Sequence, residues 1–593
     1  MTQTHRATPS SSARRPPKPV HRASVMGQKI VSFVGRRPLT ILTLVVLVYL
    51  VVVPLVTLGV SSLRPTGFVF DSGWTFENYI KVYTSPRTYR MLLDTVIFAA
   101  GGTAVALVFG ATFAWLVERT NIPGARLFRT IVILPMAMPP LLLALAWILL
   151  LSPSIGLLNT VVEGIFGANA HVFDIYTLPG MIFVEGLSLT PTAFLLTVPT
   201  LRNMDPSLED AASASGANQW RILTRITIPM MKPTLLAAAI FLFIIGLLVF
   251  DVPGLIGIRG GIFTLSSEIY YQLSGGAGAP NYGYIGAMAV LPILALFPLT
   301  ILYQRMLRKG HRYVTVTSRS FRPRKIQLGR WRYVAMIPLI VYLLAGVVLP
   351  LLMLLVTSFL PYYTKIDAST LSQLTFANYV EIFEDRHVQR AVINTAVIGF
   401  TVATALAIFA PVISRQVIRT RGLAAQVIDK LAFLPVAFSH TMIGVALVFV
   451  YLSLNAIPIY GTIWIIIIAH ITGYLTFATR TINGALLQID PDLEAAARVS
   501  GASGPMAMRR ITYPLLRPAI LVVWIWVIAH SMRELSAALI LTGRDNPVVS
   551  TVLWSFWEGG NTTVAAALGV CLMIVLGILS FAWDRFENKK VRK

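Results

Sequence analysis

Long apolar segments, separated by short polar ones, occupy most of the chain. Residues 95–117 and 130–152 contain no charged side chain, and roughly 20 consecutive apolar residues suffice for a helix to cross a lipid bilayer. Such segments predict twelve membrane-spanning helices, near residues 38–62, 91–117, 128–152, 176–200, 233–257, 284–305, 333–358, 391–414, 425–453, 460–482, 518–542 and 562–584. The pattern therefore predicts an all-α polytopic membrane protein.

The predicted spans form two similar sets of six. The motif TFENYI at 75–80 returns as TFANYV at 375–380, and a polar segment at 205–233 returns at 490–518 with 14 of 29 residues identical. Because each set holds an even number of spans, the halves share one orientation and are parallel repeats. The TFENYI and TFANYV motifs are 300 residues apart, whereas the two polar segments that follow them are 285 residues apart. The first half therefore carries about 15 more residues than the second between these two points. We expect the additional residues, around 153–174, to form a short interfacial helix on the outer side.

Basic residues cluster beside the ends of particular spans. Only 12% of the residues are charged, yet the formal net charge is +24. Because basic residues next to spans favour the cytoplasmic side, this distribution places both chain ends inside, together with the loops 118–129, 201–232, 305–332, 415–424 and 483–517. A nucleic-acid-binding module would need a folded basic surface with interleaved aromatic residues. The sequence shows none, so we expect membrane lipid, and no nucleic acid, as the partner of these segments.

The same features divide the chain into parts. Residues 1–37 contain eight Lys or Arg, no acidic residue and many Pro and Ser, a composition typical of a disordered tail. From the N-terminus, the expected parts are a cytoplasmic tail (1–37), a first half (38–310), a basic linker (311–332) and a second half (333–593). Each half carries one copy of the polar repeat between its fourth and fifth predicted spans.

The polar repeat predicts a short helix with defined ends in each half. Asp205 and Asp490 suit the N-cap position, where a carboxylate accepts hydrogen bonds from free backbone N–H groups. Prolines follow both of them, and proline suits the first helical position. Gly216 and Gly501 suit a left-handed C-cap. Small residues on one face of each predicted helix would let another surface approach closely.

The spacing Glu–x–Ala–x4–Gly in these helices is similar to the EAA loop of binding-protein-dependent ABC importer permeases. The matching positions are Glu209, Ala211, Ala212, Gly216, Glu494, Ala496, Ala497 and Gly501. The resemblance extends over about residues 38–584. It implies that each helix is a coupling helix, docked in a groove of a cytoplasmic ATPase. Asp210 departs from the family pattern, which usually has Ala there.

The resemblance also implies partners. The chain contains no G-x-x-x-x-G-K-[ST] phosphate-binding loop, so we expect no cofactor in this chain. ATP and Mg²⁺ would bind to two copies of a separate ATPase. A periplasmic or extracellular solute-binding protein would deliver the solute. The chain itself would be a multi-pass transport subunit of the bacterial inner membrane, without enzymatic activity.

The solute is less well determined than the family. The fused two-half layout and the segments FDVPGLIG (250–257) and RELSAALIL (533–541) are most similar to permeases of the ferric-iron type. Permeases for thiamine and for aminoethylphosphonate share much of this character, so another small organic or phosphorylated solute remains an alternative. A secondary transporter of the major facilitator type, which also has two parallel halves of six spans, is a more distant alternative. That class does not predict a repeated capped helix.

Several ionisable residues fall inside predicted spans, where charge is costly and usually faces a cavity or a partner. The candidates for the translocation path are Glu185, Asp251, His470, Arg533 and Glu534. Two interpretations remain open: these residues line the path and contact solute, or they pair with one another and hold helices together. With a single cysteine, Cys571, and no metal-spaced Cys/His cluster, the sequence indicates no metal site.

Overall fold

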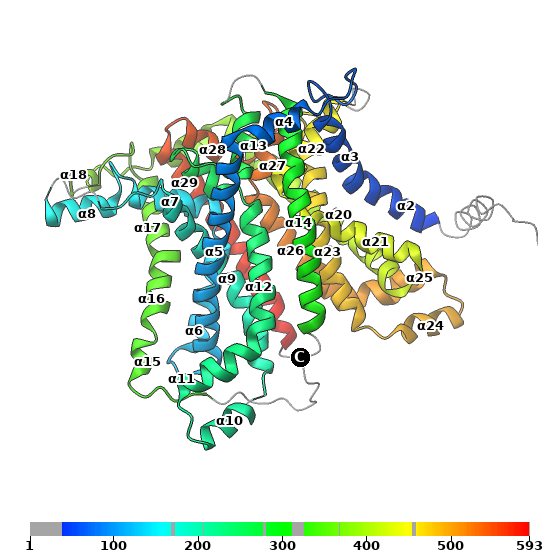
Figure 1. Ribbon diagram of the computed structural model, residues 1–593, viewed down its shortest axis with the longest axis horizontal. Helices are drawn as coiled ribbons and strands as arrows, with labels where there is room; N and C mark the ends of the chain where they lie inside the picture. Colours follow the sequence, from blue (N-terminus) through cyan, green and yellow to red (C-terminus); the bar gives the residue numbers. More distant parts are fainter. Residues whose placement is uncertain are drawn as a thin grey trace, which may run out of the picture.

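The computed structural model describes residues 38–591, except 168–171, 206, 277–279, 311–324, 367, 421 and 454–457. The expected tail and most of the expected linker lie outside this part of the chain. Within it the protein is helical, and the one β-bridge, between Thr120 and Ile326, is isolated. This confirms the predicted all-α class (Figure 1).

The helices of the first half alternate between long apolar rods and short connecting elements, some of them single π- or 3₁₀-helical turns (η). They are α2 (Pro38–Leu47), η1 (Val48–Val52), α3 (Val53–Ser62), α4 (Glu77–Thr84), α5 (Pro86–Arg119), α6 (Ala125–Ile133), η2 (Leu134–Ala137), α7 (Pro140–Leu151), α8 (Leu157–Phe166), α9 (Leu178–Asn203), α10 (Ser207–Ala214), α11 (Gln219–Ile222), η3 (Leu223–Thr227), α12 (Ile228–Leu248), η4 (Pro253–Gly257), α13 (Leu265–Leu273) and α14 (Tyr282–Gly310).

The second half repeats this order almost element by element. Its helices are α15 (Trp331–Val334), α16 (Ile337–Leu343), η6 (Leu344–Val348), α17 (Leu349–Ser358), α18 (Ala368–Leu371), α19 (Ala377–Glu384), α20 (Arg386–Arg419), α21 (Leu423–Phe433), η7 (Leu434–Ala437), α22 (His440–Ser453), α23 (Ile463–Leu487), α24 (Pro491–Val499), α25 (Gly504–Ala507), η8 (Met508–Thr512), α26 (Tyr513–Arg533), α27 (Ser536–Leu541), α28 (Val549–Glu558) and α29 (Thr562–Val591). Helices α5 and α20 have 34 residues each, and α12 and α26 have 21 each.

Two predicted spans are broken in the structure. Helices α6 and α7 meet at an angle of 94°, and α21 and α22 meet at 107°, so the expectation of continuous spans over 128–152 and 425–453 was wrong. Proline explains the first break: Pro135, Pro139 and Pro140 follow one another closely, and each lacks a backbone donor. In the second half Ser439 accepts a hydrogen bond from the N–H of Met442 (3.0 Å) and caps the new helix.

Among the described residues, nine helices are long and apolar enough to cross a membrane, or eleven if each bent pair is one span. The predicted number of twelve is therefore not confirmed. Two other spans end earlier than predicted: α12 stops at Leu248 and α26 at Arg533. Each is followed by a short separate helix, η4 or α27, so charged residues at these ends lie beside helix breaks rather than within rods.

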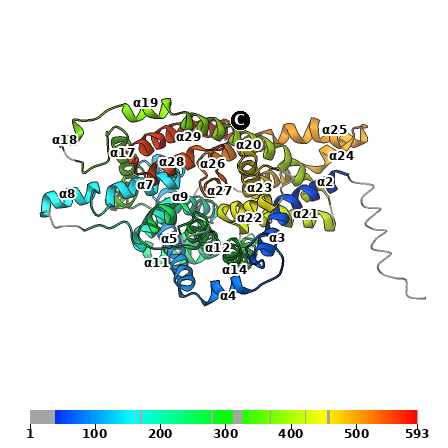
Figure 2. The ribbon, with the colours of Figure 1, turned by 90° about the horizontal axis from the view of Figure 1, so that it is seen from above.

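The two halves are interlocked rather than side by side. One apolar core joins α5 to α9 with α16, α17, α28 and α29 of the other half. The second core joins α20 to α23, α26 and α27 with η1, α3, α13 and α14 of the first half. Figure 2 shows α3 beside α22 and α17 beside α7. Burial of each half's flanking helices against the other half thus makes the fold one unit.

Glycine lets α5 and α9 pack closely. A methyl group at Gly110 of α5 would lie 2.5 Å from Cβ of Ala193 on α9, and one at Gly102 would lie 3.1 Å from Cγ of Glu185. Small residues at helix interfaces allow the backbones to approach, which is how membrane helices gain packing energy. The pair α5–α9 therefore holds Glu185 in the protein interior, where it is 1% exposed.

Short helices gather at the two ends of the bundle. In Figure 1, α10 and α11 lie at the lower end and α24 and α25 at the lower right, whereas α4, α13 and α28 lie at the upper end. Helix α8 projects from the side of the bundle in both views (Figures 1 and 2). It forms within the segment where the sequence predicted an additional short helix.

Candidate functional site

Both polar repeats fold into short helices with the expected caps. The carboxylate of Asp205 accepts a hydrogen bond from the N–H of Ser207, and that of Asp490 accepts one from the N–H of Asp492, at 2.9 Å in each case. The helices α10 and α24 end at glycines whose φ angles are +81° and +88°, a left-handed conformation that glycine adopts without a steric penalty. The proline after Asp205 lies outside the described residues.

A glutamate near the start of each helix attaches it to the membrane bundle. In the first half, Nη2 of Arg119 donates to Oε2 of Glu209 at 2.7 Å, and Oγ1 of Thr227 donates to Oε1 at 2.7 Å. Arg119 is the last residue of α5 and its side chain is 1% exposed. Glu209 therefore joins α10 both to α5 and to η3, which leads into the next long helix, α12.

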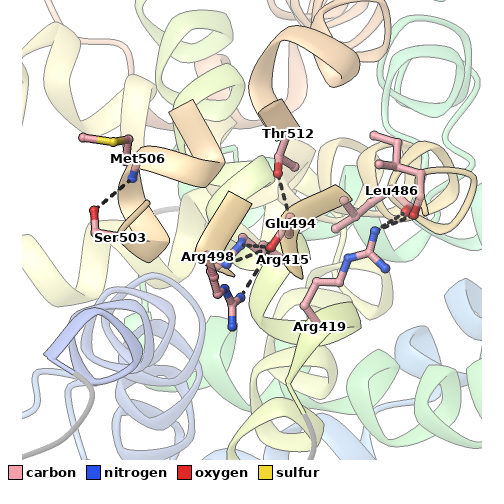
Figure 3. A network of polar contacts seen from close by, with 9 residues as sticks. Arg415, Arg419, Leu486, Glu494, Arg498, Ser503, Met506 and Thr512 are labelled. Carbon is pink, nitrogen blue, oxygen red and sulfur yellow. Dashed lines mark hydrogen bonds and ion pairs between the residues drawn. The ribbon is translucent and has the colours of Figure 1, made fainter. Parts of the chain in front are cut away.

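The second half uses the same geometry (Figure 3). Nε and Nη2 of Arg415 donate to Oε2 of Glu494 at 3.2 and 2.9 Å, and Oγ1 of Thr512 donates to Oε1 at 2.8 Å. Arg498 lies 3.6 Å away, one turn further along α24. The glutamate itself is 3% exposed, so this carboxylate is held by hydrogen bonds from two sides.

Burial disfavours the charged form of Glu494, but it does not dominate. The hydrogen bonds from Arg415 and Thr512 and the positive charges of Arg415 and Arg419 outweigh it. Together they hold the pKa of the Glu494 carboxyl below its ordinary value. The group is therefore ionised at neutral pH, and the attachment of α24 is an ion pair rather than a neutral hydrogen bond.

The arginines of the two attachments are not at equivalent positions. The counterpart of Arg119, at an offset of 300 residues, is Arg419. In the second half Arg419 instead donates to the backbone carbonyls of Leu486 (3.3 Å) and Ile489 (2.5 Å), at the end of α23. Arg415, one turn earlier in α20, takes over the glutamate. The glutamate thus has the same role in both halves, whereas the arginine that binds it lies one helical turn earlier in the second half.

The outer faces of α10 and α24 are open. Leu208 is 54% exposed, Leu493 47% and Val499 90%. The other matching positions, Ala211, Ala212, Gly216, Ala496, Ala497 and Gly501, are exposed or partly exposed. Each helix is therefore fixed to the bundle through one carboxylate while it presents small and apolar residues outward. A force applied to such a helix would pass directly into the long spans on either side of it.

The sequence pointed to the glutamates and glycines but missed their partners. Thr227 and Thr512 are identical residues at the repeat offset of 285, a signal that could have identified them. Arg119 and Arg415 gave no such signal, because they are not equivalent in the repeat. The contact between Glu494 and Arg498, four residues apart on α24, is longer than the contacts of Glu494 with Arg415.

The candidate path residues of the second half form a hydrogen-bonded cluster within the bundle. Nδ1 of His470 lies 2.7 Å from Oγ of Ser531, and Nε2 lies 3.2 Å from Oε2 of Glu534. The carboxylate of Glu534 also accepts hydrogen bonds from the N–H groups of Ala537 (3.0 Å) and Ala538 (3.2 Å) and so caps α27. His470 on α23 is thereby tied to the break between α26 and α27.

Arg533 links this cluster to the first half. Its Nη1 donates to the carbonyl oxygen of Met136 (2.7 Å), in the turn that breaks the α6–α7 span. Its Nη2 donates to Nε2 of His530 (2.9 Å), whose Nδ1 donates to the carbonyl oxygen of Trp526 (2.9 Å). The guanidinium of Arg533, beside the break between α26 and α27, thus donates to a carbonyl oxygen in the break between α6 and α7.

The first-half candidates are arranged differently. Glu185 on α9 interacts electrostatically with Asp251, and Asp251 interacts with Glu534 and Arg533. Yet Oε2 of Glu185 is buried and has no hydrogen-bond partner among the described residues. In that part of the chain, no group of three or more His, Cys, Asp or Glu is placed to hold a metal ion. The structure therefore brings the five candidates into one region without forming a metal centre.

Comparison with known proteins gives this geometry a context. Residues 106–312 and 399–593 each match the family of binding-protein-dependent transport system inner membrane components. The ferric transport system permease protein FbpB of Actinobacillus pleuropneumoniae is 26% identical over 555 residues, 92% of this chain and 77% of the relative. The putative 2-aminoethylphosphonate transport system permease protein PhnU of Salmonella typhi is 29% identical over 195 residues, 33% of this chain and 67% of the relative.

A solved structure, the bacterial alginate ABC transporter in complex with an alginate pentasaccharide-bound periplasmic protein, contains a chain 18% identical to this one. The match covers 49% of this chain and 98% of that chain, with a TM-score of 0.39. The two matches to the family model together span more than half of the sequence and include both carboxylate-anchored helices. The chain belongs to the family of binding-protein-dependent transport system inner membrane components, as a permease with two family units in one polypeptide.

Proposed function

We propose that this chain imports a solute with energy supplied by two copies of a cytoplasmic ATPase, which dock on α10 and α24. The observation that supports this most directly is the pair of matching attachments: each helix is fixed by one glutamate, the partly buried Glu209 or the buried Glu494, to an arginine of a long helix and to a threonine before the next one. Such a helix can transmit motion because the buried ion pair leaves it little freedom to slide. The chain itself would hydrolyse no ATP, and ATP and Mg²⁺ would bind to the partners.

In this proposal the end of the bundle that carries α10 and α24 faces the cytoplasm, as do both chain termini. ATP binding draws the two ATPases together, and they pull the coupling helices and switch the path from inward-facing to outward-facing. A solute-binding protein docked on the opposite end releases its solute into the opened path. Hydrolysis then resets the transporter. Because the chain belongs to a binding-protein-dependent family, a proton-coupled secondary transporter is no longer a competing proposal.

Ferric iron is the solute we propose first. The support is the similarity to the ferric permease of A. pleuropneumoniae, which extends over 92% of this chain. A small phosphonate is the second candidate, favoured by the shorter similarity to PhnU. Within the path, Glu185, Asp251, His470, Arg533 and Glu534 are the residues that we propose to meet or to frame the solute.

A reconstituted system tests the proposal. The chain would be co-purified with its cognate ATPase, placed in liposomes and supplied with its solute-binding protein loaded with ferric iron or with 2-aminoethylphosphonate. We expect ATP-dependent uptake of one of these solutes. Glu209→Ala together with Glu494→Ala should abolish the ATP turnover that depends on the binding protein, while the chain still folds in the membrane.

The matched control is Glu77→Ala, since Glu77 is exposed and makes only an i,i+4 pair with Lys81. This variant should behave as the wild type. Uptake that persists without ATP, or normal coupled turnover in the Glu209→Ala/Glu494→Ala double variant, would contradict the proposal. Transport of the phosphonate rather than iron would leave the mechanism in place and replace only the solute.

A further inference from the structure

One buried position that is equivalent in the two halves has hydrogen-bond partners in the second half but not in the first. At the repeat offset of 285, Glu185 of α9 corresponds to His470 of α23. Both side chains are buried, at 1% and 2% exposure. His470 has a partner for each ring nitrogen, in Ser531 and Glu534. Glu185 has no hydrogen-bond partner for its buried Oε2 among the described residues.

The sequence explains this difference. The positions that correspond to Ser531 and Glu534 in the first half are Gly246 and Val249, and neither side chain can donate or accept a hydrogen bond. The close approach of Gly102 on α5 leaves room for the glutamate side chain but offers it no polar group. Glu185 therefore occupies the position equivalent to His470, but the first half lacks the hydrogen-bonding side chains that contact His470 in the second half.

An unpaired carboxyl group in the interior of a membrane protein is expensive to keep. A purely structural role would favour a histidine, an amide or an apolar residue with partners, as in the second half. The nearby charges do not compensate Glu185 fully: three carboxyl groups, of Glu185, Asp251 and Glu534, interact in this region with one guanidinium, of Arg533. The first half thus contributes two carboxyl groups, of Glu185 and Asp251, to this region.

We propose that Glu185, assisted by Asp251, is the contact in the path for a positively charged solute, whereas His470, Arg533 and Glu534 form a structural cluster that holds the helix breaks. This rests on the proposed function and deepens it, because it assigns the solute to the class of cations. The contact is transient rather than a coordination site, since two carboxyl groups without further ligands bind a metal ion weakly. Weak binding suits a path from which the solute must leave.

The proposal predicts opposite signatures for two buried glutamates. Replacing a carboxyl group without partners by an amide should not lower stability, whereas replacing a carboxylate that accepts several hydrogen bonds should. Glu185→Gln should therefore cut uptake about tenfold or more, the factor expected from loss of one charged contact, with an unchanged or higher Tm. Glu534→Gln should lower the Tm, because it weakens the contact with His470 and the cap of α27.

The experiment uses the complete transporter in liposomes, with radioactive ferric iron supplied on the solute-binding protein, and the Tm of the purified complex. Glu185→Asp, which retains the charge, should restore part of the uptake. Glu268→Gln is the matched control, because Glu268 is also 1% exposed but is paired with Arg87 at 2.9 Å and with Gln272 at 2.8 Å. It should lose stability.

The outcomes distinguish a failure of the assignment of Glu185 from a failure of the proposed function. Normal uptake by Glu185→Gln, or a fall in its Tm that matches the fall of Glu534→Gln, would overturn the assignment of Glu185 while the proposed function stands. Faster uptake by Glu185→Gln would indicate an anionic solute and overturn it as well. If the wild type shows no ATP-dependent uptake of ferric iron or of the phosphonate, the proposed function fails, and the contact with a cation falls with it.

Discussion

Replacement of Arg415 by methionine tests whether the buried ion pair fixes α24 to the bundle. The side chain of Glu494 is 4% exposed and that of Arg415 is 17% exposed. Methionine fills a similar space but removes both hydrogen bonds, of 2.9 and 3.2 Å, to Oε2. The carboxylate would keep Thr512 at 2.8 Å and the more distant Arg498.

The expected cost follows from these contacts. Loss of one partner of a buried ion pair costs roughly 3–5 kcal/mol, because the other charge stays buried. Arg498, at 3.6 Å and with 56% of its side chain exposed, could recover at most about 1 kcal/mol. We therefore expect local destabilisation of α24 by roughly 3 kcal/mol, which corresponds to an increase on the order of 100-fold in its detached population.

Hydrogen–deuterium exchange of the complete chain in lipid nanodiscs measures this population directly. Amides of 492–499 should lose on the order of 100-fold in protection in Arg415→Met, and about tenfold in Thr512→Val, which removes one hydrogen bond to a charged group. Helix α10, with its own ion pair, serves as the internal control. Unchanged protection of α24, or equal loss in α10, would refute the argument that this ion pair holds the helix.

Three further predictions use the same region and the α5–α9 contact. The pKa of Glu494 is lowered from its ordinary value of 4.5, so its ion pair contributes its full stability above pH 4.5. This stability is lost as the pH falls through the lowered pKa. Over that acidic range, protection of α24 should drop in the wild type but not in Glu494→Gln. Gly501→Ala forces a φ of +88° on alanine and should destabilise α24 by about 1 kcal/mol in the same exchange assay, whereas Gly504→Ala, at a helix start with open space around it, should not. Gly110→Ala would place a methyl group 2.5 Å from Cβ of Ala193 and should lower the stability by about 1–3 kcal/mol, seen as a lower Tm; an unchanged Tm would contradict the close packing of α5 on α9.

Much of this architecture can be predicted from the sequence because its signals are local. Apolar length predicts spanning helices, and caps such as Asp490 and Gly501 set the limits of α24 to within a residue. The internal repeat adds long-range information that single segments lack: it relates the two halves and singles out Glu209 and Glu494 as equivalent. Both glutamates are among the contacts that matter most in the structure.

What could not be predicted depends on contacts between segments far apart in the chain. Local apolarity does not reveal that α6 and α7 meet at 94°, because both arms of the bent pair are apolar. The repeat itself misleads for arginine: it would pair Arg419 with Glu494 by analogy with Arg119, yet the structure uses Arg415. Arg415 and Arg419 are one helical turn apart and lie on the same face of α20. Either could therefore reach Glu494, although only Arg419 is the repeat counterpart of Arg119.

The two halves are alike where they meet the proposed ATPases and different where they meet the proposed solute. Two identical ATPase subunits that act together require two equivalent docking helices. The attachments of Glu209 and Glu494 to their threonines make α10 and α24 equivalent in this respect. The proposed path between the halves serves one solute at a time, so the residues around it need not repeat. Gly246 and Val249 stand where the other half has Ser531 and Glu534, and this difference leaves Glu185 unpartnered. If the two halves instead met the solute in the same way, Glu185→His should preserve uptake; we expect it to abolish uptake.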